Sequence, residues 1–273
     1  MLAKLPYFKT YRSVDECLDL LLMRDMRVPD REYARRTIER IGYYRISAFF
    51  YPFRDFCRLP NGGGRVRCDH FRKGSSFDDV VAFYLWDKAM RLKISDAIER
   101  IEISMRASMV EVLGAMNSHG HRDARSYQSG LSEVDENGES PLGKFTMKLE
   151  EAFQRSKEDY AKHYRDHYIG PPPIWIESGT WDWGNMTYIL QNLDEKHKNT
   201  IAGKIHPDLP RRTMESWLNA LNGVRNDCAH HSRIWNKNLV NSPGLRKGKS
   251  FPEFQHLKGK QPKGAAPTQK LYG

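Results

Sequence analysis

The sequence predicts an all-α fold, a helical bundle with a small N-terminal extension of short helices and a hairpin. From Phe77 to Leu113 the chain has neither Gly nor Pro, and apolar residues recur there every three or four positions. The same period returns between Leu209 and Trp235. At residues 60–64 a Pro-Asn-Gly-Gly-Gly turn interrupts the pattern, and its flanking segments are expected to pair as a surface hairpin.

Two short helices are expected before this hairpin. Ser13, followed closely by two acidic residues, marks the start of the first helix. Asp30 opens the second helix, which Gly42 ends. The aromatic run over residues 43–50 is more typical of a hydrophobic core than of a platform on which bases stack.

The predicted helix from Phe77 to Leu113 would reach roughly 55 Å at 1.5 Å per residue, which makes it the spine of the fold. A polar stripe follows it at steps of three and four: Asp87, Arg91, Ser95, Glu99, Glu102 and Arg106. Taken alone, this pattern favours an exposed face on which acids and bases pair across one turn.

The rest of the chain gives weaker signals. Residues 117–143 are polar and are expected to form a loop, and a helix is predicted over 145–168. His163 and His167 lie four apart in it, but no Glu follows the first as in HExxH, so solvated roles are favoured over metal binding. Pro173 suits the first position of a further helix.

The predicted organisation has three parts: N-terminal helices and hairpin (1–75), a helical bundle (76–242) and a flexible basic segment (243–273). Lys and Arg number 44 against 34 Asp and Glu, a net charge of +10. Seven basic residues and one acid lie from Gly244 onward, so six of the ten charges belong to that segment. A polyanion such as RNA, DNA or an acidic membrane surface is the natural partner of such a chain.

Several classes of protein are disfavoured. The four cysteines form no CxxC pair, so neither a disulfide framework nor a zinc site is expected, and no metal or cofactor is predicted. No apolar run approaches the roughly 18 residues that cross a membrane. The N-terminus also lacks the apolar stretch of a signal peptide, so we expect a cytoplasmic protein without a membrane partner.

The predicted last helix contains the polar residues that point most clearly to a function. Its polar stripe consists of Asn219, Asn222, Asn226, His230 and Arg233, with Arg225 one position aside. RNA cleavage without metal needs a group that moves protons and donors that meet the charge on the phosphate. Imidazole and guanidinium suit these two tasks. One imidazole does not easily act as both base and acid, so a twofold dimer is expected to bring two copies together.

A structural alternative explains the same residues. Arg225 would pair with an acid on the long helix, and His230 would cap the helix end or bond a carbonyl. On spacing alone this alternative is favoured, because Arg and His five positions apart occur by chance in many proteins.

The residues around the motif favour a catalytic role over this structural alternative. Residues 218–236, LNALNGVRNDCAHHSRIWN, resemble the signature of the Abi_2 abortive-infection family. Residues 42–47, the block 87–106, and Pro173-Ile174-Trp175 with Gly184 resemble the other blocks of that family, in the same order. The resemblance covers most of residues 13–240. That family is in turn similar to the HEPN superfamily of helical ribonucleases.

The resemblance implies a HEPN-like helical bundle that dimerises to form a composite site. It implies metal-independent cleavage of RNA and toxicity that halts a phage-infected cell, with regulation by a partner RNA in some relatives. The implied residues are Arg225, Asn226 and His230 for catalysis, His231, Glu102 and Arg106 in support, and Asn222, Arg233 and Lys237 for RNA binding.

Two rival functions remain open at this stage. One is a non-catalytic module that recognises a structured partner RNA, and the other, weaker because no helix-turn-helix pattern is present, is a basic DNA-binding regulator. One departure from the family also stands out. Relatives continue past Lys270-Leu271-Tyr272 into another apolar helix, whereas this chain ends at Gly273, and one interpretation is a truncated C-terminus.

Overall fold

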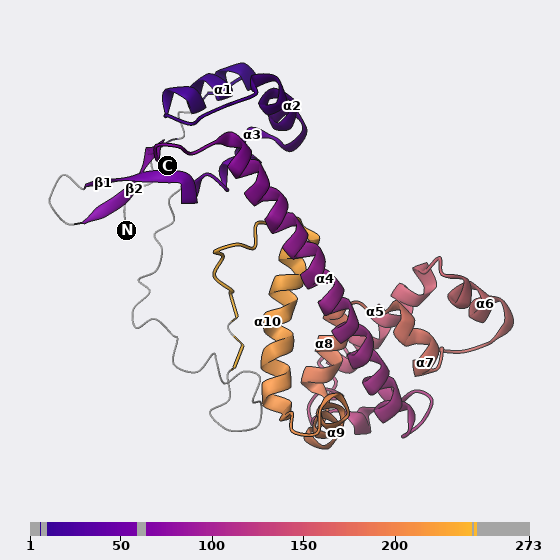
Figure 1. Ribbon diagram of the computed structural model, residues 1–273. Coiled ribbons are helices and arrows are strands. Elements are labelled where there is room, and N and C mark those ends of the chain that lie inside the picture. The colour runs from indigo at the N-terminus through magenta and orange to yellow at the C-terminus, as the bar shows by residue number, and fades with distance from the viewer. Residues whose placement is uncertain (1–5, 7–9, 59–63, 242, 245–273) are drawn as a thin grey trace. The chain divides into compact units, whose positions relative to one another are not determined.

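The computed structural model describes residues 6, 10–58, 64–241 and 243–244 (Figure 1). As predicted, this part of the chain is mostly helical and contains a two-stranded antiparallel sheet. It forms two compact units. We call residues up to Ala97 together with Arg225–Asn238 the N-terminal unit, and Ile98–Val224 with the residues from Leu239 the central unit.

The N-terminal unit begins with short elements followed by the long helix. Their bounds are α1 (Val14–Met23), α2 (Arg31–Ile41), α3 (Tyr43–Ser47), β1 (Arg54–Arg58), β2 (Arg65–Phe71) and α4 (Phe77–Gly114), and α4 passes into the central unit at Ile98. The Ser13 side chain accepts from the Glu16 amide while the Glu16 carboxylate accepts from the Ser13 amide, which confirms the predicted start of α1. The predicted hairpin and the predicted second helix, with its N-cap at Asp30, are confirmed as well.

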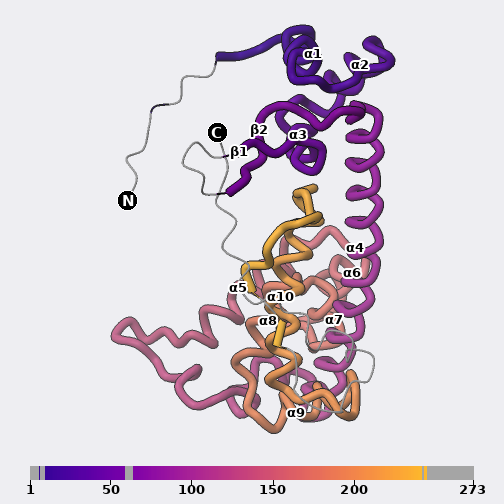
Figure 2. Tube along the Cα trace, turned by 60° about the vertical axis from the view of Figure 1, so that its left-hand side comes forward, coloured from indigo at the N-terminus to yellow at the C-terminus, as the bar shows by residue number. Residues whose placement is uncertain are grey.

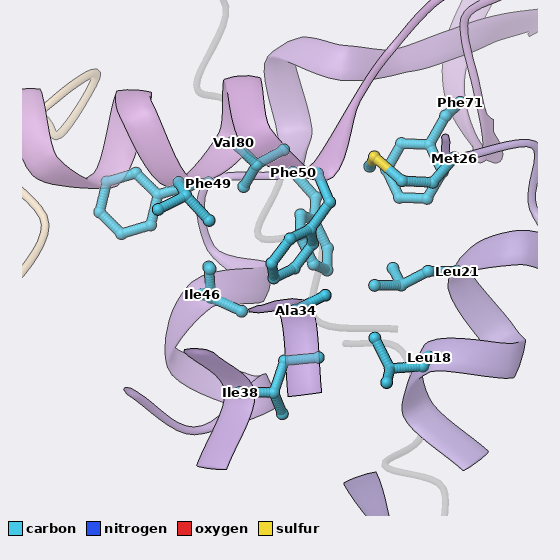
Figure 3. Close-up of a cluster of buried hydrophobic side chains, with 12 residues drawn as sticks. Leu18, Leu21, Met26, Ala34, Ile38, Ile46, Phe49, Phe50, Phe71 and Val80 are labelled. Carbon is cyan, nitrogen blue, oxygen red and sulfur yellow. The ribbon is translucent and has the colours of Figure 1, made fainter. Parts of the chain in front are cut away.

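An aromatic-rich core holds this unit together (Figure 3). Ile46, Phe49 and Phe50 are almost completely buried, and Phe50 meets Phe71 of β2 edge-on at 5.6 Å between ring centroids. The prediction that the aromatic run forms core is therefore confirmed for these side chains. Tyr44 differs, because 66% of it is exposed.

Helix α4 is one continuous helix of 38 residues, which Figure 2 shows as an uninterrupted coil. Its bounds match the predicted span to within one residue at the C-terminal end. An apolar period that neither Gly nor Pro interrupts is typical of a long helix.

The central unit contains the remaining helices. They are α5 (Pro141–Arg155), α6 (Asp159–His167), α7 (Ile174–Glu177), α8 (Trp183–Asn192), α9 (Glu195–Ile205) and α10 (Arg211–Ala229), the last of which enters the N-terminal unit at Arg225. The single helix predicted over 145–168 is wrong. The backbone becomes extended at Ser156, which ends α5. Arg165 of α6 donates to the carbonyls of Phe153 (2.7 Å) and Ser156 (2.9 Å), and these bonds stabilise the break between the two helices.

Candidate functional site

The predicted motif lies where α10 ends. Helix α10 stops at Ala229, so the prediction of helix as far as Trp235 is wrong. The amide of Ser232 donates to the Asp227 carbonyl at 2.8 Å and that of His231 to the Cys228 carbonyl at 3.1 Å. These two bonds form a Schellman motif, which satisfies the last carbonyls of the helix and turns the chain away.

His231 occupies the position in this motif that usually belongs to glycine. Its φ is +56°, in the left-handed region that costs an L-residue with a side chain roughly 1–2 kcal/mol. Gly therefore normally marks such a helix end in a sequence. Because a histidine occupies this position, no glycine marks the end of the helix, and the predicted helix extends too far.

The segment that follows α10 is held by a buried ion pair on α4. Asp87 is fully buried and accepts from the backbone amides of Trp235 (2.9 Å) and Ile234 (3.2 Å). Arg91, 5% exposed, pairs with Asp87 and donates to the Ser232 carbonyl at 3.3 Å. The expectation of an exposed charged face is therefore wrong for these two residues, whose charges serve to fix another part of the chain.

Further contacts fix the same segment. Arg45 of α3 donates to the His231 carbonyl at 2.7 Å. Arg233 donates to the Ala48 carbonyl at 3.3 Å and lies over the Trp235 ring. The Trp235 ring meets Phe83 edge-on at 4.9 Å. Arg233 thus lies beyond the helix rather than on its polar stripe, because the helix ends before it.

The side chains that fix the segment after α10 form what we call the supporting layer: Arg45, Asp87, Arg91 and Arg233. The three motif side chains differ from them. Asn226 and His230 are exposed and lie one turn apart, and the amide of His230 donates to the Asn226 carbonyl at 2.9 Å. Arg225 is half-buried. Within the described residues, none of the three side chains makes a hydrogen bond or an ion pair.

The neighbours of the motif have defined contacts. Lys237 pairs with Asp227 at 2.5 Å. Cys228 is buried, which raises the pKa of its thiol, so this cysteine stays protonated and does not serve as a nucleophile. Of the titratable side chains in residues 228–231, the imidazoles of His230 and His231 are exposed, whereas the Cys228 thiol is not.

The other predicted residues belong to the central unit. Arg106 donates to Glu102 at 2.8 Å and to the Trp181 carbonyl at 2.9 Å, and both charged side chains are partly buried. Asn222 lies on α10 one turn before Asn226 and is half-buried. The structure thus groups Arg225, Asn226, His230, His231, Arg233 and Lys237 in the N-terminal unit, and places the remaining three in the central unit.

The family comparison gives a clear result. The model of the Abi_2 family, described as Abi-like protein, matches residues 36–236, which is most of the 273-residue chain. This chain belongs to the Abi_2 family. The membership indicates a role in abortive infection, a defence of bacteria against phage. No curated protein and no solved structure matches the chain.

The Abi_2 match includes the whole supporting layer of the candidate site. It begins within α2 at Arg36 and ends at Asn236, directly after the segment that Asp87 and Arg91 hold. The motif and the residues that fix its backbone therefore all lie inside the part of the chain that defines the family.

One buried cluster of this Abi_2 chain was not predicted. In the central unit His121 hydrogen-bonds Glu177 through Nε2, and both side chains are fully buried. Arg122 bridges Glu177 and Glu150. Burial lowers the pKa of His121, which favours a neutral imidazole. The cluster joins the turn around His121 to α5 and α7, which gives residues 117–143 a fixed anchor where a polar loop was expected.

No metal site is evident in the described residues. They contain no group of three or more His, Cys, Asp or Glu side chains that is arranged to hold an ion. His163 and His167 stack at 4.2 Å, and Nδ1 of His167 bonds the His163 carbonyl. Among the helices described, none has the length and apolar composition needed to cross a membrane.

The strained position of His231 leads to a first prediction. His231→Gly should raise the free energy of unfolding by about 0.5–1 kcal/mol, because glycine adopts positive φ without steric cost. Urea denaturation of the two proteins measures the difference. His231→Ala is the matched control, since it removes the imidazole but keeps the backbone strain, and it should not be stabilised. A destabilised His231→Gly would show that contacts of the side chain outweigh the strain.

Proposed function

We propose that this Abi-like protein is a metal-independent endoribonuclease, a toxin of an abortive-infection system, with its site at the end of α10. The single observation that carries the proposal is the contrast between the motif side chains, which have no partners among the described residues, and the backbone beside them, which is held in place. Arg225, Asn226 and His230 present unpartnered polar groups. The backbone beside them is fixed by the buried pair Asp87 and Arg91. A site whose reacting groups are free and whose support is rigid is organised for catalysis.

The proposed reaction uses these groups in turn. His230 takes the proton of a ribose 2′-hydroxyl, which attacks the adjacent phosphorus. Arg225 binds the non-bridging phosphate oxygens, where negative charge grows in the transition state. Asn226 orients the phosphate or the imidazole. The bond from phosphorus to the 5′-oxygen breaks, and the products are a 2′,3′-cyclic phosphate and a 5′-hydroxyl.

The leaving 5′-oxygen must gain a proton while the 2′-oxygen loses one. We propose that His230 of a second copy supplies it, in a homodimer that brings two α10 ends together. The arrangement Arg225, Asn226, three residues and His230 resembles the HEPN motif, and the proposed HEPN-like bundle follows from that resemblance. His231 would support the site beside its neighbour.

The remaining predicted residues take secondary roles in the proposal. Asn222, one turn before Asn226 on α10, would bind RNA together with Arg233 and Lys237, whose backbone and ion-pair contacts hold them near the motif. Glu102 and Arg106, which pair with each other in the central unit, are the other residues that the resemblance implies in a supporting role. A regulatory RNA is a further proposed partner.

The proposal is tested by incubating the purified chain with labelled single-stranded RNA in the presence of EDTA. Cutting should continue at an undiminished rate, because no step requires a divalent cation. Cutting that appears only after Mg²⁺ or Mn²⁺ is added would contradict the proposal. RNA binding without any cutting, under all these conditions, would instead favour the non-catalytic RNA-binding alternative.

A further inference from the structure

The hairpin in the N-terminal unit has two different faces. Its register pairs Phe56 with Arg67, Cys57 with Val66, and Arg58 with Arg65. Because side chains alternate along a strand and directly opposed residues point the same way, Phe56, Arg58, Arg65 and Arg67 share one face. We call these four residues the basic ribbon face.

An aromatic ring and a guanidinium are stacked on this face. The guanidinium of Arg67 lies 4.0 Å from the centre of the Phe56 ring and 5.4 Å from that of Tyr51. Phe56 nevertheless remains 49% exposed, so the ring keeps a free surface. A half-exposed aromatic beside arginines is the arrangement on which proteins stack unpaired bases.

Two like charges lie opposite each other on the same face. Arg58 and Arg65 stand directly opposite each other, and both are exposed. Neither makes an ion pair or hydrogen bond to the described residues around it. Like charges at opposed positions destabilise a strand pair. An anion bound between the two guanidinium groups would remove this cost.

Other arginines near the hairpin are already occupied. Arg24 and Arg54 both pair with Asp69, at 3.1 and 3.3 Å. Arg72 donates to the Pro52 carbonyl at 2.6 Å. Arg67 also donates to the Arg54 carbonyl, while its guanidinium lies over the Phe56 ring. On the basic ribbon face, Arg58 and Arg65 are therefore the arginines without a hydrogen-bond or ion-pair partner among the described residues.

We propose that the basic ribbon face binds single-stranded RNA, with Arg58 and Arg65 on phosphates and a base stacked on Phe56 and Arg67. The identity of the ligand as RNA rests on the proposed function. A single strand is favoured because stacking on Phe56 requires a base that is not already paired and stacked in a duplex. The hairpin then acts as a substrate-binding surface separate in sequence from the cutting motif.

The test measures binding of a short labelled single-stranded RNA by fluorescence anisotropy, with the full chain carrying His230→Ala so that the RNA stays intact. Adding Arg58→Gln and Arg65→Gln should weaken binding about tenfold and reduce the slope of log affinity against log salt by about 1.4, for two lost phosphate contacts. Phe56→Ala should weaken binding about 5- to 100-fold, whereas Phe56→Tyr should retain it.

The matched control is Arg36→Gln with Arg40→Gln, which removes the same charge from exposed positions on α2. Its affinity should change by less than about threefold. Circular dichroism of every variant checks that the fold is kept. Equal losses in the control and in the hairpin variant, unchanged affinity in the hairpin variant, or tighter binding to duplex DNA of the same sequence would each overturn the inference.

Failure of this inference is distinguishable from failure of the proposed function. If the chain binds RNA through the basic ribbon face but never cuts it, the ribonuclease proposal fails and the inference stands. If the chain cuts RNA and the hairpin variant binds as tightly as the parent, the inference fails and the ribonuclease proposal stands.

Discussion

His230→Ala should lower the rate of RNA cleavage by about two to four orders of magnitude, the range that a positioned general acid or base contributes. The imidazole has no partner among the described residues, so its loss should leave the fold and the RNA affinity nearly unchanged. Single-turnover cleavage measures the rate, and anisotropy measures the affinity. His163→Ala, which removes an imidazole of the central unit, is the matched control and should cut at the wild-type rate.

The composite site adds a second expectation for the same variant. If each site needs His230 from both copies, an excess of His230→Ala should suppress the wild-type protein by forming inactive mixed dimers. A rate that depends only on the amount of wild-type chain, with no suppression, would contradict the two-histidine mechanism. A His230→Ala protein that cuts within about threefold of wild type would contradict a catalytic role for His230 altogether.

Asp87→Ala should destabilise the fold by about 3–5 kcal/mol, the usual cost of leaving one member of a buried ion pair alone. Arg91, 5% exposed, would lose its partner, and the amides of Ile234 and Trp235 would lose their acceptor. Urea denaturation measures the stability. Hydrogen exchange over residues 231–238 gives the local effect, and the Ile234 and Trp235 amides should lose protection first.

Two companion variants make this expectation specific. Asp79→Ala removes an exposed acid from the first turn of α4 and should cost no more than about 1 kcal/mol. Replacing both partners, Asp87→Leu with Arg91→Leu, should recover part of the loss, because no unpaired charge then remains buried. If Asp87→Ala were as stable as Asp79→Ala, the segment after α10 would be held by other contacts.

Regular local patterns allowed much of the fold to be predicted. The apolar period without Gly or Pro placed α4, and a serine followed by acids placed the start of α1. The turn at residues 60–64 predicted the hairpin, which the structure confirms. These signals are short in sequence, so they do not depend on distant parts of the chain.

Features that depend on distant partners were missed. Asp87 and Arg91 fit an exposed ion pair by spacing, and only the backbone of Ile234 and Trp235, far along the chain, explains their burial. His121 and Glu177 are 56 residues apart, and no local pattern links them. The end of α10 was missed for a different reason, because His231 takes the conformation that usually signals Gly.

The sequence led to a hypothesis about the residues of the candidate site, whereas the contacts that surround them came from the structure. Spacing alone left Arg225 and His230 undecided between catalysis and a structural role. Their lack of partners within the described residues argues against the structural alternative, since neither pairs with an acid nor bonds a carbonyl through its side chain. The assignment of these residues to a site and the reaction at that site are both proposals.

The most direct measurement compares a short RNA with its 2′-deoxy counterpart of the same sequence, each incubated with the purified chain in EDTA and analysed by mass spectrometry. If Arg225 and His230 cut RNA through the 2′-hydroxyl, only the RNA should be cleaved, with 2′,3′-cyclic phosphate and 5′-hydroxyl ends, and His230→Ala should yield no product. Cleavage of the deoxy strand, or products that end in a 3′-hydroxyl and a 5′-phosphate, would show that the chain uses a different reaction.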